Sequence, residues 1–335
     1  RRVARLGERR RAVLTLDPPL QMHLEDELER FAVPYGAVVA IEPATGRVLA
    51  YVSHSSANGR AGDLALDPTP PTASVFKIVT ASALVDAGVG RNREVCYSGG
   101  SRRLTRAHLE DGAGGACASF GEAMGRSINA IFAKLADRHL DRPTLERYGS
   151  AFGFGHALPF DVPTRASPFE VPGERLERAR MAAGFWHAHM SPLHGALIAA
   201  TVANDGRMPR AAIVDRVEDA EGTVLHRHEP EVFRAVIPRR TARTLTRMME
   251  NTVARGTARR TFFDREGRAF LPGVSVAGKT GTLSSERPYR GYTWFVGFAP
   301  ADAPTIAVAT LVVNTPEWRI KASYLAREAL RTYLR

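Results

Sequence analysis

The sequence predicts an α+β fold, with an antiparallel sheet flanked by helices and an inserted, mostly helical subdomain. Strand patterns occur near the start of the chain and again in its last third, whereas helical patterns dominate from about residue 78 to about residue 185. The 335 residues, 44% of them apolar, suffice for one large domain or two ordinary ones with a substantial core. These observations exclude a collagenous, coiled-coil or wholly disordered chain.

The first elements are a basic opening and a hairpin. Six arginines lie within residues 1–11, and we expect residues 1–34 to form a basic linker arm, extended over 13–21 and helical over 22–30. The apolar runs 36–40 and 47–53 flank a turn-rich stretch and predict a hairpin that opens the domain proper, residues 35–335.

The remaining elements follow from composition and periodicity. Residues 55–72 and 102–116 are rich in turn-forming or polar residues and predict loops. Four further segments predict helices: 74–85 (with Gly88 as a plausible C-terminal cap), 192–204, 241–253 and 323–333. Three apolar segments of the last third predict strands: 274–283, 294–300 and 305–313.

The charge balance limits the classes of partner. Forty-six basic against 35 acidic residues give a net charge of +11, which favours anionic neighbours. The chain contains no zinc-finger spacing, RNA-binding aromatic signature or phosphate-binding loop, so we expect no nucleic-acid partner. The longest apolar stretches, such as 196–203 and 305–313, are shorter than the roughly 20 residues of a membrane helix.

Lysine is rare among the basic residues. Only Lys77, Lys134, Lys279 and Lys321 are lysines, and the other 42 are arginines. A lysine in such a chain indicates a need that arginine does not meet, such as an amine that can lose its proton. Two of the four occur in motifs that suggest catalysis.

The first motif is Ser74-Val75-Phe76-Lys77 at the start of a predicted helix. Positions three apart lie on one face of a helix, so the Ser74 hydroxyl and the Lys77 amine can meet. A serine hydroxyl needs a neighbouring base to become a nucleophile, and a lysine can be that base if burial or a nearby charge lowers its pKa. The alternative is an ordinary helix start with Ser74 as its N-cap.

Two further motifs lie downstream. Ser127-Ile128-Asn129 places a hydroxyl and an amide at a helix start, where simple capping is the alternative. Lys279-Thr280-Gly281-Thr282 lies on a predicted strand, where Lys and Thr suit a carboxylate and Gly permits a close approach. A hairpin strand with a bulge is the alternative there.

The three motifs in this order resemble those of the serine penicillin-binding proteins and serine β-lactamases. The third motif is followed by Trp294–Pro300, and the hairpin segment 36–50 is similar to the first hairpin of a penicillin-binding transpeptidase domain. The segment from Ser191 to Gly206 is also similar to that family, so the resemblance covers nearly the whole chain from about residue 14.

The resemblance implies acyl transfer. Ser74 would attack the D-Ala–D-Ala carbonyl of a peptidoglycan stem peptide, and an amine from a neighbouring stem would resolve the acyl-enzyme into a cross-link. Lys77 would be the base, made less basic by the charge of Lys279. Ser127 would pass the proton to the leaving amine.

The resemblance also assigns the substrate contacts. Asn129 would hold the substrate amide, and Thr280 and Thr282, beside Gly281, would bind the terminal carboxylate. Backbone N–H groups of Ser74 and Thr282 would form the oxyanion hole. The edge of the strand 274–283 would take the substrate as an added strand.

Two departures concern the subclass. The family usually carries Pro-Gly before the nucleophile, where this chain has Thr72-Ala73, and the preceding loop lacks an Asn-Arg-Ala signature. A β-lactamase must hydrolyse its acyl-enzyme, for which the best-known class uses a Glu in a Glu-x-x-Leu-Asn loop, and Glu170, Glu174 and Glu177 do not form that pattern. A D,D-carboxypeptidase, a β-lactamase of the same fold and a non-enzymatic β-lactam sensor remain as alternatives.

Cysteine and histidine give weaker signals. Cys96 and Cys117 precede Ser127, and both a disulfide and two separate thiols are consistent with the sequence. His187, His189 and His194 lack the partners and spacing of a zinc site, so we expect no metal and no cofactor.

The resemblance implies location and partners. Stem peptides and β-lactam antibiotics are the expected ligands, and other cell-wall synthesis proteins are possible partners. The chain begins with Arg and shows no signal peptide, so we expect an anchoring segment upstream of it. The expected location is the periplasmic face of a bacterial inner membrane.

Overall fold

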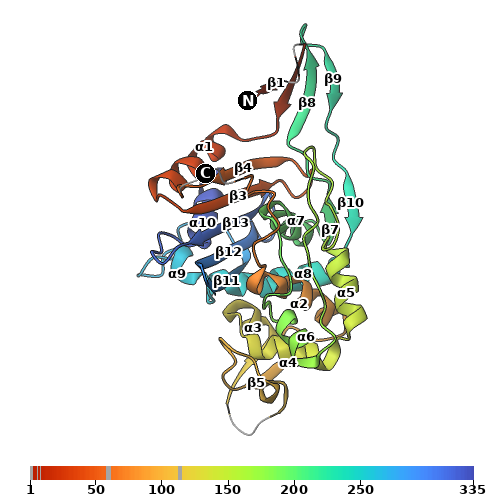
Figure 1. The fold of residues 1–335 in the computed structure, drawn as a ribbon, viewed down its shortest axis with the longest axis vertical. Coiled ribbons are helices and arrows are strands. Elements are labelled where there is room, and N and C mark those ends of the chain that lie inside the picture. Colours follow the sequence, from red (N-terminus) through yellow and green to blue (C-terminus); the bar gives the residue numbers. More distant parts are fainter. Residues whose placement is uncertain (1–2, 6, 8, 58–61, 112–114) are drawn as a thin grey trace.

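The computed structural model describes residues 3–5, 7, 9–57, 62–111 and 115–335. Its centre is a five-stranded antiparallel sheet in the order β11-β12-β13-β3-β4, with helices on both faces (Figure 1). Its strands are β3 (Tyr35–Ile41), β4 (Val48–His54), β11 (Ala277–Glu286), β12 (Tyr289–Ala299) and β13 (Ile306–Asn314). The expected α+β class with an antiparallel sheet is confirmed, and the first and last thirds of the chain supply its strands.

Alternate residues of the central strands enter two different cores, because successive side chains of a strand point to opposite faces. On β3, Ala37 and Val39 belong to the core under α2, α7 and α8, whereas Val38 and Ala40 belong to the core under α1 and α10. The helices on these faces are α1 (Pro18–Arg30), α2 (Lys77–Asp86), α7 (Pro192–Ala203), α8 (Arg239–Ala254) and α10 (Ala322–Tyr333). Both faces of the sheet are therefore covered by helices and buried from solvent.

A mostly helical block lies on one side of the sheet (Figure 1). It follows the hairpin β3–β4 in the chain, as the sequence predicts. Besides α2, this part of the chain contains η1 (Ala73–Phe76), β5 (Glu94–Tyr97), η2 (Arg106–Leu109), β6 (Ala116–Ser119), α3 (Phe120–Arg126), α4 (Asn129–His139), α5 (Arg142–Ala151) and α6 (Arg175–Ala182).

A second sheet projects from the opposite end of the molecule (Figure 1). It has the order β1-β2-β8-β9 and contains β1 (Val3–Arg5), β2 (Arg10–Leu14), β8 (Val214–Asp219) and β9 (Val224–Arg227). The other short elements are β7 (Arg207–Pro209), β10 (Val232–Ala235) and α9 (Arg259–Phe262).

The expected linker arm is largely part of the folded body. Strand β2 pairs with β8, and α1 buries Leu20, Leu24 and Leu28 completely against the sheet. Their spacing of four residues puts them on one face of a helix that Asp17 caps, and this face needs a covering partner. Residues 1, 2, 6 and 8 of the basic opening lie outside the described residues.

Several elements begin or end a few residues from their expected positions. Strand β11 runs from 277 to 286 instead of 274 to 283, because its pairing with β12 continues without a register shift to the tight turn at 287–288. Within the part of the chain that the structure describes, no helix is long and apolar enough to cross a membrane.

Candidate active site

The three motifs meet in one cavity of about 380 Å³, although they lie far apart in the sequence. It opens where η1, the start of α4 and the edge strand β11 come together. The motif residues that line it are Ser74, Ser127, Asn129, Thr280, Gly281 and Thr282.

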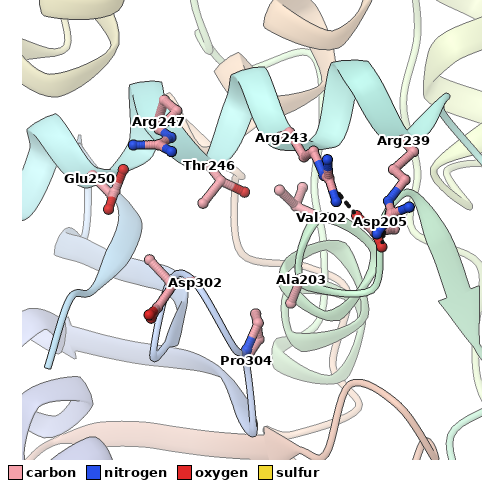
Figure 2. Close-up of a pocket in the computed structure, with 11 residues that line it drawn as sticks. Val202, Ala203, Asp205, Arg239, Arg243, Thr246, Arg247, Glu250, Asp302 and Pro304 are labelled. Carbon is pink, nitrogen blue, oxygen red and sulfur yellow. Dashed lines mark ion pairs between the residues drawn. The ribbon is translucent and has the colours of Figure 1, made fainter.

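A second cavity of about 410 Å³ lies between the end of α7, the outer face of α8 and the loop after β12 (Figure 2). No motif residue lines it. Asp205 pairs there with Arg239 and Arg243 at 3.0 and 3.7 Å. Charged groups that line this cavity therefore partly neutralise one another. The cavity that holds the motifs is therefore the candidate active site.

Ser74 lies in the turn η1, directly before α2. Its hydroxyl does not cap the turn, which excludes the capping alternative. Ala73, the residue before it, has φ of 49°, in the left-handed region that favours glycine. The position where the family usually carries glycine thus keeps a glycine-like conformation, and Ser74 is partly exposed to the cavity.

Lys77 lies beneath Ser74 and is fully buried. Its Nζ donates to Asn129 Oδ1 at 2.7 Å and to the Ala183 carbonyl at 2.5 Å, and it lies 2.8 Å from Ser74 Oγ. Burial, and secondarily the charge of Lys279, lowers the pKa of Lys77 well below its ordinary value of 10.5. A neutral amine beside a serine hydroxyl can accept its proton.

Ser127 and Asn129 form the opposite wall. Ser127 ends α3 with φ of 57°, and Asn129 begins α4. The Asn129 side chain does not cap that helix, because its Nδ2 donates to the Ser101 carbonyl at 2.7 Å while its Oδ1 accepts from Lys77. The amide is thereby fixed at the rim of the cavity.

Lys279 reaches Ser127 from β11. Its Nζ donates to Ser127 Oγ and to the Thr280 carbonyl, both at 2.9 Å, and the side chain is fully buried. Burial lowers the pKa of Lys279 from 10.5 to about 7. Two buried lysines thus each hold one serine hydroxyl, and the two pairs face the same cavity.

Gly281 lets β11 approach the nucleophile. A Cβ there would lie 3.1 Å from Ala73 Cβ and 3.2 Å from the Thr72 carbonyl. The register with β12 is continuous, so the bulge alternative for this strand is wrong. Because β11 is an edge strand, its outer backbone groups are free to pair with an extended ligand.

Several residues of this cavity belong to none of the three motifs and were not predicted from the sequence. Thr257 Oγ1 lies 2.5 Å from Thr280 Oγ1, and Lys321 and Ser323 line the far side of the cavity. Gly256 gives one retrospective signal, since a Cβ there would lie 2.1 Å from the Gly125 carbonyl near the end of α3. Lys321 could have been singled out from the sequence because lysine is rare in this chain.

Cys96 and Cys117 face each other on the strands β5 and β6 and are joined by a disulfide in the structure. The disulfide closes the chain segment between Cys96 and Cys117 next to α4. Lys134 of α4 donates to the Cys96 carbonyl at 3.0 Å. The disulfide lies outside the cavity but supports the segment that carries Ser101.

The three histidines have separate partners. His194 is fully buried between Ser167 Oγ at 2.7 Å and the Phe152 carbonyl at 2.8 Å. His187 pairs with Glu177, and His189 lies 2.7 Å from the Thr69 carbonyl. Among the described residues, no three His, Cys, Asp or Glu side chains gather as metal ligands would.

The antiparallel sheet, the helical block and the cavity between them define the class of the domain. The family model described as the penicillin binding protein transpeptidase domain matches residues 36–332, and the chain belongs to this family. The resemblance inferred from the motifs is thereby confirmed.

Relatives and solved structures agree with this assignment. The chain is 30% identical over 318 residues to the peptidoglycan D,D-transpeptidase PbpA of Mycolicibacterium smegmatis, covering 83% of this chain and 61% of the relative. PbpA of Mycobacterium tuberculosis is 29% identical over 90% of this chain and 66% of the relative. The chain thus spans less than two thirds of these relatives.

The fold also matches a crystal structure of PBPA from M. tuberculosis, with a TM-score of 0.81 and 24% identity over 97% of this chain and 82% of that one. Its ceftriaxone acyl-enzyme complex matches with a TM-score of 0.80 and 24% identity, over 97% of this chain and 80% of that one.

Proposed function

We propose that this chain is a peptidoglycan D,D-transpeptidase domain that cross-links stem peptides through a Ser74 acyl-enzyme and is inhibited by covalent β-lactam binding. One observation carries the proposal: Ser74 Oγ and Ser127 Oγ each lie within 2.9 Å of a fully buried lysine amine, in one cavity. Membership of the transpeptidase family and the D,D-transpeptidase relatives support it.

The acylation step follows from this geometry. Ser74 Oγ attacks the carbonyl carbon of the penultimate D-Ala while its proton passes to the neutral amine of Lys77, 2.8 Å away. The backbone N–H groups of Ser74 and Thr282 receive the negative oxygen as the carbonyl becomes tetrahedral. The C–N bond then breaks, and Ser127, held by Lys279, delivers the proton to the departing D-Ala amine.

The remaining contacts orient the donor. Asn129, fixed between Lys77 and the Ser101 carbonyl, binds the peptide amide. Thr280 and Thr282 bind the terminal carboxylate beside Lys279. Attack by an amine of a neighbouring stem on the ester carbonyl then forms the cross-link and frees Ser74.

The surroundings of Lys77 favour a long-lived acyl-enzyme. The partners of its Nζ among the described residues are Ser74, Asn129 and the Ala183 carbonyl, with no carboxylate. Of the three candidate deacylating residues, Glu174 caps α6 and Glu177 pairs with Arg180 and His187. This arrangement supports a transpeptidase over a β-lactamase.

The proposed reaction takes place on the extracytoplasmic side of a bacterial membrane, where peptidoglycan lies. Anchoring through a segment upstream of this chain, and contacts with other cell-wall synthesis proteins, belong to the same proposal.

Intact-mass spectrometry with benzylpenicillin tests the nucleophile. We expect a lasting adduct of the whole drug on the natural protein and none on Ser74→Ala. Release of D-Ala from a stem peptide, and its transfer to an added amine, then separates a transpeptidase from a carboxypeptidase or a sensor. Rapid drug hydrolysis without an adduct would identify a β-lactamase, and no reaction at all would refute the proposal.

A further inference from the structure

A cavity of about 320 Å³ adjoins the candidate active site on the side of α6. Arg102, Arg103 and Leu104 form one wall, and the segment from Phe185 to His187 forms the other. None of these residues belongs to the three motifs, and none has a role in the acylation chemistry described above.

Both walls continue into the active site. Arg102 follows Ser101, whose carbonyl accepts from Asn129 at 2.7 Å and which itself lines the active-site cavity. On the other wall, the Ala183 carbonyl accepts from Lys77, and a Cβ at Gly184 would lie 2.9 Å from Ser74 Cα. Both walls of this cavity are therefore continuous with the segments that border Ser74 and Asn129.

Trp186 is held in an unfavourable conformation at the cavity. Its φ is 42°, a region that bulky residues rarely adopt, and 43% of its surface is exposed. The backbone on either side is fixed: Gly184 packs against Ala73 and Ser74, and Ala188 bridges to Phe169. Strain that the surrounding fold maintains is concentrated at ligand-binding sites in proteins, and here it presents an indole to solvent.

The charge of the cavity is uncompensated and positive. Glu177 is already paired with Arg180 and His187, and Arg180 also donates to the Leu104 carbonyl at 2.6 Å. Arg102 and Arg103 are exposed and make no ion pair with any residue that the structure describes. Two free guanidinium groups beside an aromatic face favour a carboxylate borne on an aliphatic chain.

We propose that Arg102, Arg103 and Trp186 form a subsite for a free carboxylate on the donor stem peptide, on the side chain of the residue that precedes D-Ala–D-Ala. The aliphatic part of that side chain lies on Trp186, and its carboxylate pairs with the two arginines. This inference rests on the proposed function and specifies its substrate class: a donor with an anionic third residue, in preference to one whose carboxylate is amidated.

Two probe peptides test the subsite: N-acetyl-X-D-Ala-D-Ala in which X is L-2-aminoadipate or its side-chain carboxamide. They differ in one ionisable group. Their affinities are measured by calorimetry on the Ser74→Ala protein, so that the result does not depend on acylation. We expect the carboxylate peptide to bind at least ten-fold more tightly than the carboxamide.

Substitutions test which residues cause the preference for the carboxylate peptide. Arg102→Gln/Arg103→Gln in the Ser74→Ala background is expected to reduce the ratio to below two-fold. Arg227→Gln, on strand β9 at the far end of the molecule (Figure 1), removes an exposed arginine of the same type and should keep the full ratio. Trp186→Gly, which accepts positive φ without strain, should weaken both peptides without lowering the Tm.

The outcomes separate the two proposals. Equal affinities in the Ser74→Ala protein, or a ratio that survives in the double arginine variant, would overturn the subsite. A Trp186→Gly protein with a lower Tm and unchanged affinities would show that Trp186 is structural and remove it from the subsite. Benzylpenicillin acylation of the natural protein tests the proposed function separately, because it does not use the probe peptides.

Discussion

Lys279 Nζ lies 2.9 Å from Ser127 Oγ and connects the edge strand β11 to the end of α3. Lys279 also acts on the pair formed by Lys77 and Ser74. Burial is the larger cause of the lowered pKa of Lys77, and the positive charge of Lys279 is the second. One side chain is thus placed to set both the position of Ser127 and the basicity of Lys77.

Lys279→Gln should move the acid limb of the acylation rate to higher pH. Without the neighbouring positive charge, the protonated form of Lys77 becomes less unfavourable, so the pKa of Lys77 rises and the neutral base appears later in the titration. The expected displacement is toward higher pH, because the substitution removes the second cause of the lowered pKa of Lys77. The measurement is the second-order rate constant for acylation by a fluorescent penicillin between pH 5 and 9.

Lys279→Arg is the control, since it keeps the charge and changes the donor geometry. Its rate constant should fall, and its acid limb should not move to higher pH, because the guanidinium stays charged over the whole range. An unchanged limb in Lys279→Gln would show that the charge of Lys279 does not influence Lys77.

Lys279→Met should change how stability depends on pH. Burial lowers the pKa of Lys279 from 10.5 to about 7, so the unfolded state binds more protons than the folded state between these values. The free energy of unfolding of the natural protein therefore rises with pH in that window. Any advantage of the Met variant is largest below about pH 7 and should shrink by on the order of 4 kcal/mol toward pH 10.5.

Urea unfolding of both proteins between pH 6.5 and 10 measures this difference. Since Lys77 is present in both, its own titration largely cancels. Parallel stability curves would mean that the Lys279 amine is neutral, or equally protonated, in both states over the whole range.

Local patterns were sufficient to predict the hairpin β3–β4, the helix α8 and the three strands of the last third. In each case an apolar period of two or 3.6 residues is bounded by turn residues or caps. The motif residues could be named because serine and lysine three positions apart must share a helical face. That all three motifs meet in one cavity followed from the family resemblance and from no local pattern.

Contacts between elements that are far apart in the sequence account for the features that local sequence patterns did not predict. Thr257 contacts Thr280 from the segment after α8, where Gly256 packs closely against the Gly125 carbonyl. Trp186, with its positive φ, lies between Gly184, which packs against η1, and Ala188, which bridges to Phe169, and no local propensity encodes these contacts. The packing of α1 was missed because the arginines before it suggested a solvated arm.

Removal of the disulfide should destabilise the domain. Cys96 and Cys117 are 21 positions apart, and a bridge over a loop of that length contributes about 3 kcal/mol on the chain-entropy estimate. We expect Cys96→Ser/Cys117→Ser to lose about this much in urea unfolding at pH 7. The natural protein treated with a reductant should approach the variant, and equal stabilities of the oxidised protein and the variant would contradict the estimate.

Gly184→Ala should displace the turn that carries Ser74, the proposed nucleophile. Gly184 has φ of 89°, and a Cβ there would lie 2.3 Å from the Ala73 carbonyl oxygen and 2.9 Å from Ser74 Cα. Both contacts are with backbone, so the turn that carries Ser74 must move, and a shift near 1 Å in a catalytic group lowers rates about 100-fold. We expect at least this loss in the rate constant for benzylpenicillin acylation.

Gly88→Ala is a matched control, because Gly88 has φ of 88° and no atom within 4 Å of an added Cβ. It should lose about 1 kcal/mol of stability from backbone strain and keep its acylation rate. If both variants acylate at the natural rate, the contact between Gly184 and the Ser74 turn does not position the nucleophile.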